Sequence, residues 1–415
     1  MTVAFVTLGC KLNYAESAAY ARGFKAAGLE VVPWSKGADL FVVNTCSVTA
    51  TSDSKSRSAI RKLHRLRPDA PIVVTGCYAE LRREEVEALE GVARVFGAAE
   101  KARLVPDTLV LLEGTVSPSP ARDNTVFGAY SIGGRTRSFL KVQDGCDNFC
   151  AYCAVPYARG RSRSIPICEA VRAARDIAAS GTREIVLTGV NTGDFGRTTG
   201  ERFLDLLKAL NEVEGIERYR ISSIEPNLIT EEIVDWIASV TKFLPHFHIP
   251  LQTGSDVQLK RMGRRYTTAF FRERIEYIRS RMEGPGRPKV FFGIDVMVGL
   301  PGETEALFEE TRAFIESVRP AFIHIFPYSR RPGTRAAAWP DQVPETVKAE
   351  RVKALEALCD RLHADFIASN RGLTERVLWE SKEKDGTMSG FTGNYIKVTR
   401  PYEAGLSGTI TEVTI

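Results

Sequence analysis

The sequence has few cysteines and histidines and no long apolar run. Its 415 residues include eight cysteines and five histidines, far below the cysteine density of a disulfide-stapled extracellular domain. The longest apolar stretches, such as 290–300, are much shorter than the roughly 20 residues of a membrane helix, and Asp295 interrupts this one. Lys11 comes before any apolar signal core can form. We therefore expect no export and no membrane association, and a protein of the reducing cytoplasm.

Neither sign of charge dominates the chain. Lys and Arg total 56 against 51 Asp and Glu, a net charge of +5, which is too mild to indicate a polyanionic partner by itself. Apolar residues make up 44% and charged residues 26%. This balance excludes disordered and collagen-like classes, and the length predicts about two to four domains.

Residues 1–113 alternate short apolar runs with helical patterns. We expect strands in VAFVTLG, LFVVNT, PIVVTG and RVFG, and helices at about 14–27, 48–66 and 82–90. Such alternation predicts an open parallel α/β sheet. Residues 114–138 are rich in Gly, Pro and Ser and read as a linker.

The same alternation returns in residues 139–371. Six candidate strands, FLKVQ, EIVLTGV, YRISSIEP, HFHIPLQ, VFFGIDVMVGL and FIHIFPYS, are separated by helix-length segments. Six β/α units predict a partial (β/α)6 barrel, followed by a long charged helix at 344–371. Residues 372–415 show strand-like alternation and predict a small β-barrel, so the whole is an α/β protein of three domains.

Three cysteines crowd together after the first barrel strand. Cys146, Cys150 and Cys153, here called the barrel cysteine set, have the spacing C-x3-C-x2-C. Three thiolates from one loop would leave one iron of a 4Fe-4S cluster open to a small molecule. Zinc would ordinarily need a fourth protein ligand, and no further His or Cys lies close in sequence.

Three other cysteines each follow a predicted strand of the first domain. Cys10, Cys46 and Cys77, here called the N-terminal cysteine set, would meet in the crevice at the carboxyl ends of parallel strands. A second three-thiolate cluster is one interpretation, and burial of each as a small apolar residue is the other. Cys168 and Cys359 lie in helical patterns without partners, and we expect both to be core thiols.

These cysteines stand among motifs that resemble the radical S-adenosylmethionine enzymes, and among them the methylthiotransferases. The further matching segments are LTGVNTGDFG at 187–196, SSIEP at 222–226, IPLQTGSD at 249–256, RMGRRYT at 261–267, DVMVGLPGET at 295–304 and FPYSRRPGT at 326–334. The resemblance covers nearly the whole chain and implies an N-terminal cluster domain, a radical domain and a TRAM-like RNA-binding domain. The segment TLGCKLN is similar to the branch that acts on threonylcarbamoyladenosine in tRNA.

The resemblance implies two 4Fe-4S clusters, with all six cysteines as metal ligands and catalytic residues. It implies S-adenosylmethionine as cofactor and a low-potential electron donor such as flavodoxin or ferredoxin. Residues at or near strand ends would contact S-adenosylmethionine. They are Tyr152, Thr188, Gly189, Asn191, Gly193, Ser223, Glu225, Gln252, Ser255, Arg264 and Val298.

Two groups of arginines are candidates for RNA binding. Arg57, Arg61 and Arg65 recur at four-residue spacing on one helix face, and Arg159, Arg161 and Arg163 follow the barrel cysteine set. Phosphate contacts give salt-sensitive affinity, and the anticodon loop of tRNA offers unstacked bases. A solvated helix face is the alternative for the first group, and a solvated surface is the alternative for the second. We interpret His248, on an apolar strand, as a core histidine.

The sequence thus predicts an enzyme that adds a methylthio group at C2 of N6-threonylcarbamoyladenosine at position 37 of tRNA. The alternatives are a methylthiotransferase acting on isopentenyl adenosine in tRNA or on a ribosomal-protein aspartate. A different class is an iron–sulfur RNA-binding or electron-transfer protein without radical chemistry, which would not need LTGVN, SSIEP and LPGET. A third class is a zinc-structured RNA-binding module.

Overall fold

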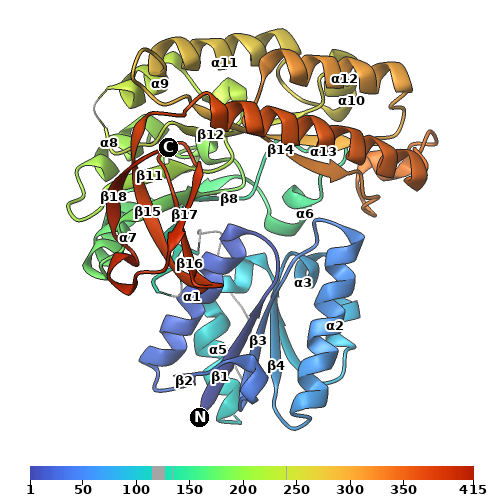
Figure 1. Cartoon of the computed structure of the whole chain (residues 1–415). Helices are drawn as coiled ribbons and strands as arrows, with labels where there is room; N and C mark the ends of the chain where they lie inside the picture. Colours follow the sequence, from blue (N-terminus) through green and yellow to red (C-terminus); the bar gives the residue numbers. More distant parts are fainter. Residues whose placement is uncertain (115–126, 134, 240) are drawn as a thin grey trace.

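A parallel sheet forms the N-terminal domain, shown in blue in Figure 1. The computed structural model describes residues 1–114, 127–133, 135–239 and 241–415. The sheet has the order β2-β1-β3-β4-β5. Its strands are β1 Thr2–Thr7, β2 Glu30–Val31, β3 Leu40–Thr45, β4 Ile72–Gly76 and β5 Val92–Phe96. The helices are α1 Lys11–Ala26, α2 Ala50–Leu66, α3 Cys77–Leu81, α4 Arg83–Glu87 and α5 Leu104–Leu112. Every residue of β3 and β4 is buried, because helices cover both faces of a parallel sheet.

The first domain differs from expectation at two places. The helix expected at 82–90 is instead the pair α3 and α4, because the backbone of Arg82 leaves the helical region with φ −137° and ψ 46°. The two-residue edge strand β2 is exposed and lacked an apolar pattern. Of the predicted linker, residues 115–126 and 134 lie outside the described residues, and β6 Ala129–Tyr130 pairs with the first barrel strand.

Six parallel strands form the partial barrel, at the positions predicted. They are β7 Arg137–Lys141, β10 Glu184–Thr188, β11 Arg218–Ile221, β12 His246–Gln252, β13 Phe291–Val298 and β14 Phe322–Pro327. They fall into the sheets β11-β10-β7-β6 and β12-β13-β14. The N–H of Ile224 donates to the carbonyl of His248 at 3.0 Å, which links the two sheets into one curved wall.

Amphipathic helices cover the outside of the barrel. In α7 Ile167–Ala179, Ala170, Ala174 and Ile177 recur on one buried face. Full burial of a side chain such as Ile177 contributes roughly 1.5–3 kcal/mol. The other helices are α6 Val155–Arg159, α8 Phe203–Asn211, α9 Glu231–Ala238, α10 Asp256–Met262, α11 Thr268–Met282, α12 Glu305–Val318 and α13 Glu345–Ala368. A short hairpin, β8 Gln143–Asp144 with β9 Arg163–Ser164, flanks the barrel cysteine set.

The C-terminal module is an antiparallel sheet of order β17-β16-β15-β18. Its strands are β15 Thr374–Lys384, β16 Thr387–Phe391, β17 Lys397–Pro401 and β18 Ile410–Thr414. The predicted barrel closure would need β17 to meet β18, and this order leaves both at the edges. Figure 1 shows the sheet (red) beside the barrel and above α1.

Two buried arginines of barrel strand β11 fasten this module. The guanidinium of Arg220 donates to the carbonyls of Gly393 at 2.8 Å and Thr392 at 2.9 Å. Arg218 donates to the carbonyl of Phe391 at 3.2 Å. Glu184 on β10 forms ion pairs with both arginines. The C-terminal module is therefore held by hydrogen bonds from within the barrel wall.

Membrane-spanning helices were not expected. Of the helices in the described ranges, none combines the length and apolar character needed to cross a bilayer.

Candidate functional site

The N-terminal cysteine set lies at the carboxyl ends of neighbouring strands. Cys10 follows β1 and caps α1, Cys46 follows β3, and Cys77 follows β4 and begins α3. These strands are adjacent, and their ends face the barrel (Figure 1). Burial raises the pKa of the Cys77 thiol, and Cys10 and Cys46 raise it further. The three sulfur atoms therefore lie within electrostatic reach of one another.

Gly9 brings the loop of Cys10 against Cys46. Its φ is +101°, a conformation that residues with a Cβ rarely adopt. A Cβ at this position would lie 2.8 Å from the Cβ of Cys46. The approach of the two strand-end loops therefore depends on the glycine of TLGC.

The barrel cysteine set lies in the loop between β8 and α6. Burial raises the pKa of the Cys146 thiol to about 11 and that of Cys153 to about 12, and Cys150 raises both. The N–H of Asn148 donates to Cys146 Sγ at 3.5 Å. Arg264 Nη1 lies 3.4 Å from Cys150 Sγ, to which it donates. The loop thus gathers three thiols with donors directed at their sulfur atoms.

Both sets fit an iron–sulfur cluster in their donor chemistry. Each consists of free thiols beside an arginine, which is Arg159 for the N-terminal set and Arg264 for the barrel set. A neighbouring cation favours the thiolate that binds metal. Within the described ranges no three Cys, His, Asp or Glu side chains stand close enough to hold one metal ion. A four-iron cluster puts each thiolate on a different iron, so its ligands stand farther apart than those of a single ion.

One cavity brings the two sets together. It has a volume of about 200 Å³ and lies between the N-terminal domain and the barrel. Cys77 of the N-terminal set lines it, as do Tyr152 and Cys153 of the barrel loop. Gln252 and Met297, from β12 and β13, form part of the opposite wall. Residues of both cysteine sets therefore border the same cavity.

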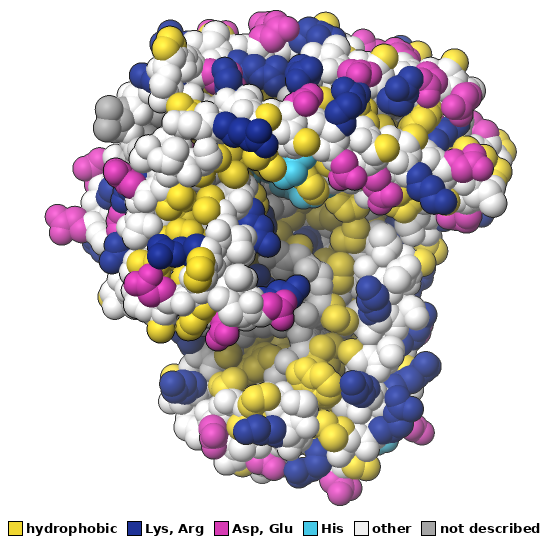
Figure 2. All heavy atoms as spheres, in the orientation of Figure 1, with side chains coloured by type: hydrophobic (Ala, Val, Ile, Leu, Met, Phe, Trp, Pro, Cys, Tyr) yellow, Lys and Arg dark blue, Asp and Glu magenta, His cyan; other side chains and the backbone are white. Residues whose placement is uncertain are grey.

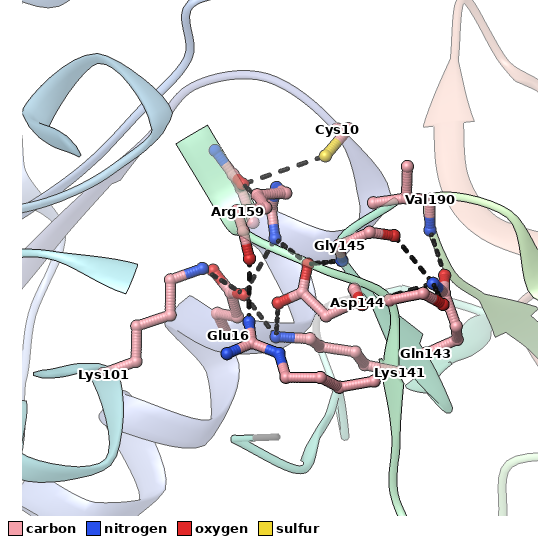
Figure 3. Close-up of polar contacts among 12 residues, drawn as sticks. Cys10, Glu16, Lys101, Lys141, Gln143, Asp144, Gly145, Arg159 and Val190 are labelled. Atoms are coloured by element: carbon pink, nitrogen blue, oxygen red, sulfur yellow. Dashed lines mark hydrogen bonds and ion pairs between the residues drawn. The ribbon is translucent and has the colours of Figure 1, made fainter. Parts of the chain in front are cut away.

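A buried ionic network joins the two domains behind the cysteine sets (Figure 3). Glu16 on α1 accepts from Lys101 at 2.7 Å, from Lys141 on β7 at 2.6 Å and from Arg159 on α6 at 3.3 Å. Asp144 pairs with Lys141 at 2.6 Å and with Arg159 at 2.9 Å. Burial alone would raise the pKa of Glu16, but the three cations hold it well below its usual range. The network has three cations for two carboxylates, so one positive charge is left over beside the cysteines.

Arg159 also contacts the first cysteine loop. Its Nη2 donates to the side-chain oxygen of Asn13, and that same oxygen lies 3.8 Å from Cys10 Sγ. The expectation that Arg159 binds RNA is therefore wrong: only 3% of this residue is exposed, and carboxylates occupy its guanidinium.

Gln143 connects the barrel cysteine loop to the strand-end turn at 189–193. Its Oε1 accepts from the N–H groups of Val190 at 2.9 Å and Asn191 at 3.0 Å, and its Nε2 donates to the carbonyl of Gly145 at 2.7 Å. Figure 3 shows Gln143 between Gly145 and Val190. The turn and the cysteine loop are thus held in a fixed relation.

Several residues expected to contact S-adenosylmethionine come together beside the barrel cysteine set. Glu225 accepts from Arg264 at 2.6 Å and from Asn148 at 2.9 Å. Asn191 Oδ1 accepts from the N–H of Glu225 at 3.2 Å. Gln252 ends β12 with φ +71°, and strained residues of this kind gather at functional sites.

The other residues expected to contact S-adenosylmethionine differ in whether their groups already bond or pack within the protein. Thr188 Oγ1 and Ser255 Oγ are buried without a hydrogen-bond partner in the described part of the chain. Gly189 lies against Gln143, and Gly193 lies against Ile224 and Leu228. The carbonyl of Ser223 accepts from Thr192. The Val298 side chain belongs to the apolar core.

The other arginines that were candidates for RNA binding differ in their exposure to solvent. Arg61 and Arg65 are exposed, while Arg57 pairs with Glu85 at 3.0 Å. Arg161 has a side chain that is 76% exposed and lies 3.6 Å from Asp147. Arg163 is half-buried and donates to the carbonyl of Arg159.

The structure also shows where two further cysteines and one histidine lie. Cys359 is buried as expected, but Cys168 is exposed at the start of α7, which corrects its expected place in the core. His248 is partly buried and pairs with Asp295 at 2.7 Å.

Sequence reasoning did not identify Glu16, Lys101, Lys141, Gln143 or Asp144 as site residues. Lys141 carried a signal, because it is the charged residue within the apolar strand FLKVQ. A buried cation requires a partner, but the partner Glu16 lies 125 positions away.

Family models match both large domains. Residues 2–97 match "Uncharacterized protein family UPF0004", and residues 140–315 match "Radical SAM superfamily". A solved structure with a similar fold is the radical S-adenosylmethionine methyltransferase TsrM from Kitasatospora setae, with TM-score 0.60 and 15% identity. The match covers 81% of this chain and 75% of that one.

Curated relatives match over almost the entire length. One is the threonylcarbamoyladenosine tRNA methylthiotransferase MtaB of Bacillus subtilis, 39% identical over 100% of this chain and 93% of the relative. Another is the tRNA-2-methylthio-N(6)-dimethylallyladenosine synthase of Desulfosudis oleivorans, 35% identical over 95% of this chain and 86% of the relative. With two cysteine sets facing one cavity and relatives of this identity along its whole length, the chain belongs to the radical S-adenosylmethionine methylthiotransferase family.

Proposed function

We propose that the chain replaces the hydrogen on C2 of N6-threonylcarbamoyladenosine, at position 37 of tRNA, by a methylthio group. The observation that carries the proposal is the cavity of about 200 Å³ shared by Cys77 and Cys153. Relatives named for threonylcarbamoyladenosine reach 39% identity, against 35% for those named for dimethylallyladenosine. This difference favours the first substrate.

The two cysteine sets divide the chemistry. When bound, four-iron clusters on Cys146, Cys150 and Cys153 and on Cys10, Cys46 and Cys77 would supply the electron that cleaves S-adenosylmethionine and the sulfur that is transferred. The hydrogen of C2 leaves with the deoxyadenosyl group, and a second S-adenosylmethionine provides the methyl group. A flavodoxin or ferredoxin would be the source of electrons.

The chain's own residues orient and shield this reaction. Arg264 and Asn148 bind one carboxylate, Glu225, and so hold the barrel cysteine loop against the strand-end turns. Thr188, with its unpartnered hydroxyl, and Gln252, on the cavity wall, are groups available to S-adenosylmethionine. The position of the cavity between two domains limits the access of water to a reactive radical.

RNA binding would use exposed cations and the anticodon loop. Arg61, Arg65 and Arg161 are exposed and suited to phosphate contacts. The bases of an anticodon loop are unstacked and can be turned outward, so position 37 can leave the loop for the interior of the enzyme.

The test is a product analysis with two RNA substrates. The enzyme is reconstituted anaerobically with iron and sulfide, reduced with dithionite, and given S-adenosylmethionine with tRNA bearing threonylcarbamoyladenosine or isopentenyl adenosine. Nucleosides and deoxyadenosine are then measured by mass spectrometry. We expect a methylthio product from the first tRNA only. Product from the second tRNA alone would identify isopentenyl adenosine as the substrate instead. Absence of deoxyadenosine would refute the radical reaction.

A further inference from the structure

A second, larger cavity lies where the three domains meet. Its volume is about 580 Å³, within the roughly 300–1,000 Å³ typical of small-molecule sites. Cys10 and Lys11 come from the N-terminal domain, Arg220 and His246 from the barrel, and Tyr395 from the C-terminal module. Figure 2 shows a hollow at the centre of this face, with Lys and Arg side chains along its wall.

The wall of this cavity carries surplus positive charge. Four cations, Lys11, Arg135, Arg137 and Arg220, face one carboxylate, Glu380. Arg137 pairs with Glu380 at 3.1 Å and with Glu184 at 2.8 Å, and Arg220 pairs with Glu184 at 2.7 Å. Both guanidiniums therefore already have carboxylate partners.

Lys11 and Arg135 differ from these two arginines. Within the described ranges, neither side chain has an ion pair with a carboxylate, and the Lys11 ammonium has no hydrogen-bond acceptor. Arg135 lies over the ring of Tyr14, 4.5 Å from its centroid. Two cations on one cavity wall, adjacent to Cys10, are a setting for an anionic ligand group.

Aromatic side chains also line this cavity. Tyr14 and Phe139 meet edge to face at 5.6 Å between ring centroids, and Tyr395 is a further lining residue. Aromatic side chains are the usual platforms for an unstacked base. The cavity therefore offers aromatic surface beside the two cations.

We propose that Lys11, assisted by Arg135, binds the threonyl carboxylate of the target nucleoside and so selects threonylcarbamoyladenosine. This inference rests on the proposed function, and it adds the residues that choose the substrate. A dimethylallyl group has no charge to bind there. The two cations recognise an anionic group, and an RNA phosphate is the alternative anion to the threonyl carboxylate.

The test compares two anticodon stem-loops that differ in one group. One carries threonylcarbamoyladenosine, and the other carries its neutral carboxamide analogue. Dissociation constants are measured by fluorescence anisotropy with the reconstituted enzyme, for wild type, Lys11→Met and Arg135→Met. Lys25→Met is the matched control, since Lys25 is exposed at the far end of the same helix. Iron content and circular dichroism report whether each variant folds and holds its clusters.

We expect wild type and Lys25→Met to prefer the carboxylate on the order of tenfold or more, as for a hydrogen bond to a charged group. Lys11→Met should remove most of this preference while binding the carboxamide RNA like wild type. Arg135→Met should reduce the preference as well. Because Arg135 is 11 positions from the nearest cysteine, this variant still tests the inference if Lys11→Met loses iron.

Other outcomes overturn the inference in recognisable ways. Equal weakening of both RNAs by Lys11→Met would assign Lys11 to phosphate, and an unchanged preference in both variants would exclude the carboxylate site. If wild type forms methylthio product yet binds both RNAs equally, the inference alone fails. If wild type forms no methylthio product, the proposed function fails.

Discussion

Arg159 donates a hydrogen bond to Asn13 across the interface between the barrel and the N-terminal domain. Arg159 is six positions after Cys153, and Asn13 is three positions after Cys10. The two cysteine sets are therefore connected through one buried guanidinium. Any shift of one domain against the other would break this contact.

Replacing Arg159 tests the connection. Arg159→Met removes the buried hydrogen bonds of this guanidinium to Glu16, Asp144 and Asn13, and a hydrogen bond to a charged group contributes about 1.5–3 kcal/mol. We expect the free energy of unfolding, measured with urea, to fall by about that amount. Arg161→Met is the control: its side chain is 76% exposed, and a surface pair is worth at most about 1 kcal/mol. Equal effects of the two variants would contradict the role of Arg159.

The buried network also predicts a dependence of stability on acid. The pKa of Glu16 is lowered from 4.5 in the folded protein. Its contribution to stability is therefore present above about pH 4.5 and is lost as the pH falls through the folded-state pKa. In urea unfolding of the metal-free protein between pH 6 and 3, Glu16→Gln should be less stable at pH 6 and should lose less stability on acidification. A parallel decline in both proteins would show that Glu16 is not held in its charged form.

Gly145, directly before Cys146, should tolerate no side chain. Its φ is +75°, and a Cβ would lie 2.0 Å from the carbonyl oxygen of Arg161. Gly145→Ala should displace the cysteine loop and lower both iron content and deoxyadenosine formation at least tenfold, roughly the effect of 1.4 kcal/mol or more. Gly181→Ala is a matched control, because φ is +83° there but no atom lies within 4 Å of the added Cβ. Normal iron content in Gly145→Ala would refute this account.

Single cysteine changes should separate the two sets. Cys150→Ala removes a ligand from the barrel set and should abolish deoxyadenosine formation. Cys46→Ala removes a ligand from the N-terminal set and should abolish methylthio product while deoxyadenosine still forms. Both products are measured by mass spectrometry beside the iron content of each variant. Loss of all iron in folded Cys46→Ala would contradict the division.

Local patterns predicted most of the fold. The six barrel strands and the parallel sheet were evident because buried parallel strands are continuous apolar runs. The edge strand β2 and the break at Arg82 were not, because exposed strands and single-residue dihedral changes leave no apolar period. The C-x3-C-x2-C spacing indicated the barrel cysteine set, and positions after predicted strands indicated the N-terminal set. The partners of Glu16 depend on how two domains dock, and those of Gln143 depend on contacts between distant turns of the barrel. That information is spread over distant positions, and one consequence was the wrong expectation for Arg159.

Arg218 and Arg220 connect the barrel wall to the carbonyls of residues 391–393. Deletion of the residues after 371 would remove the carbonyl acceptors of these two guanidiniums and expose them, together with Glu184. It would also remove Tyr395 from the cavity wall. The last 44 residues are thus a structural part of the catalytic body rather than a detachable RNA-binding appendage. Whether these residues contribute to RNA recognition is therefore tested by substitutions on the exposed strands, because a deletion would report on folding instead.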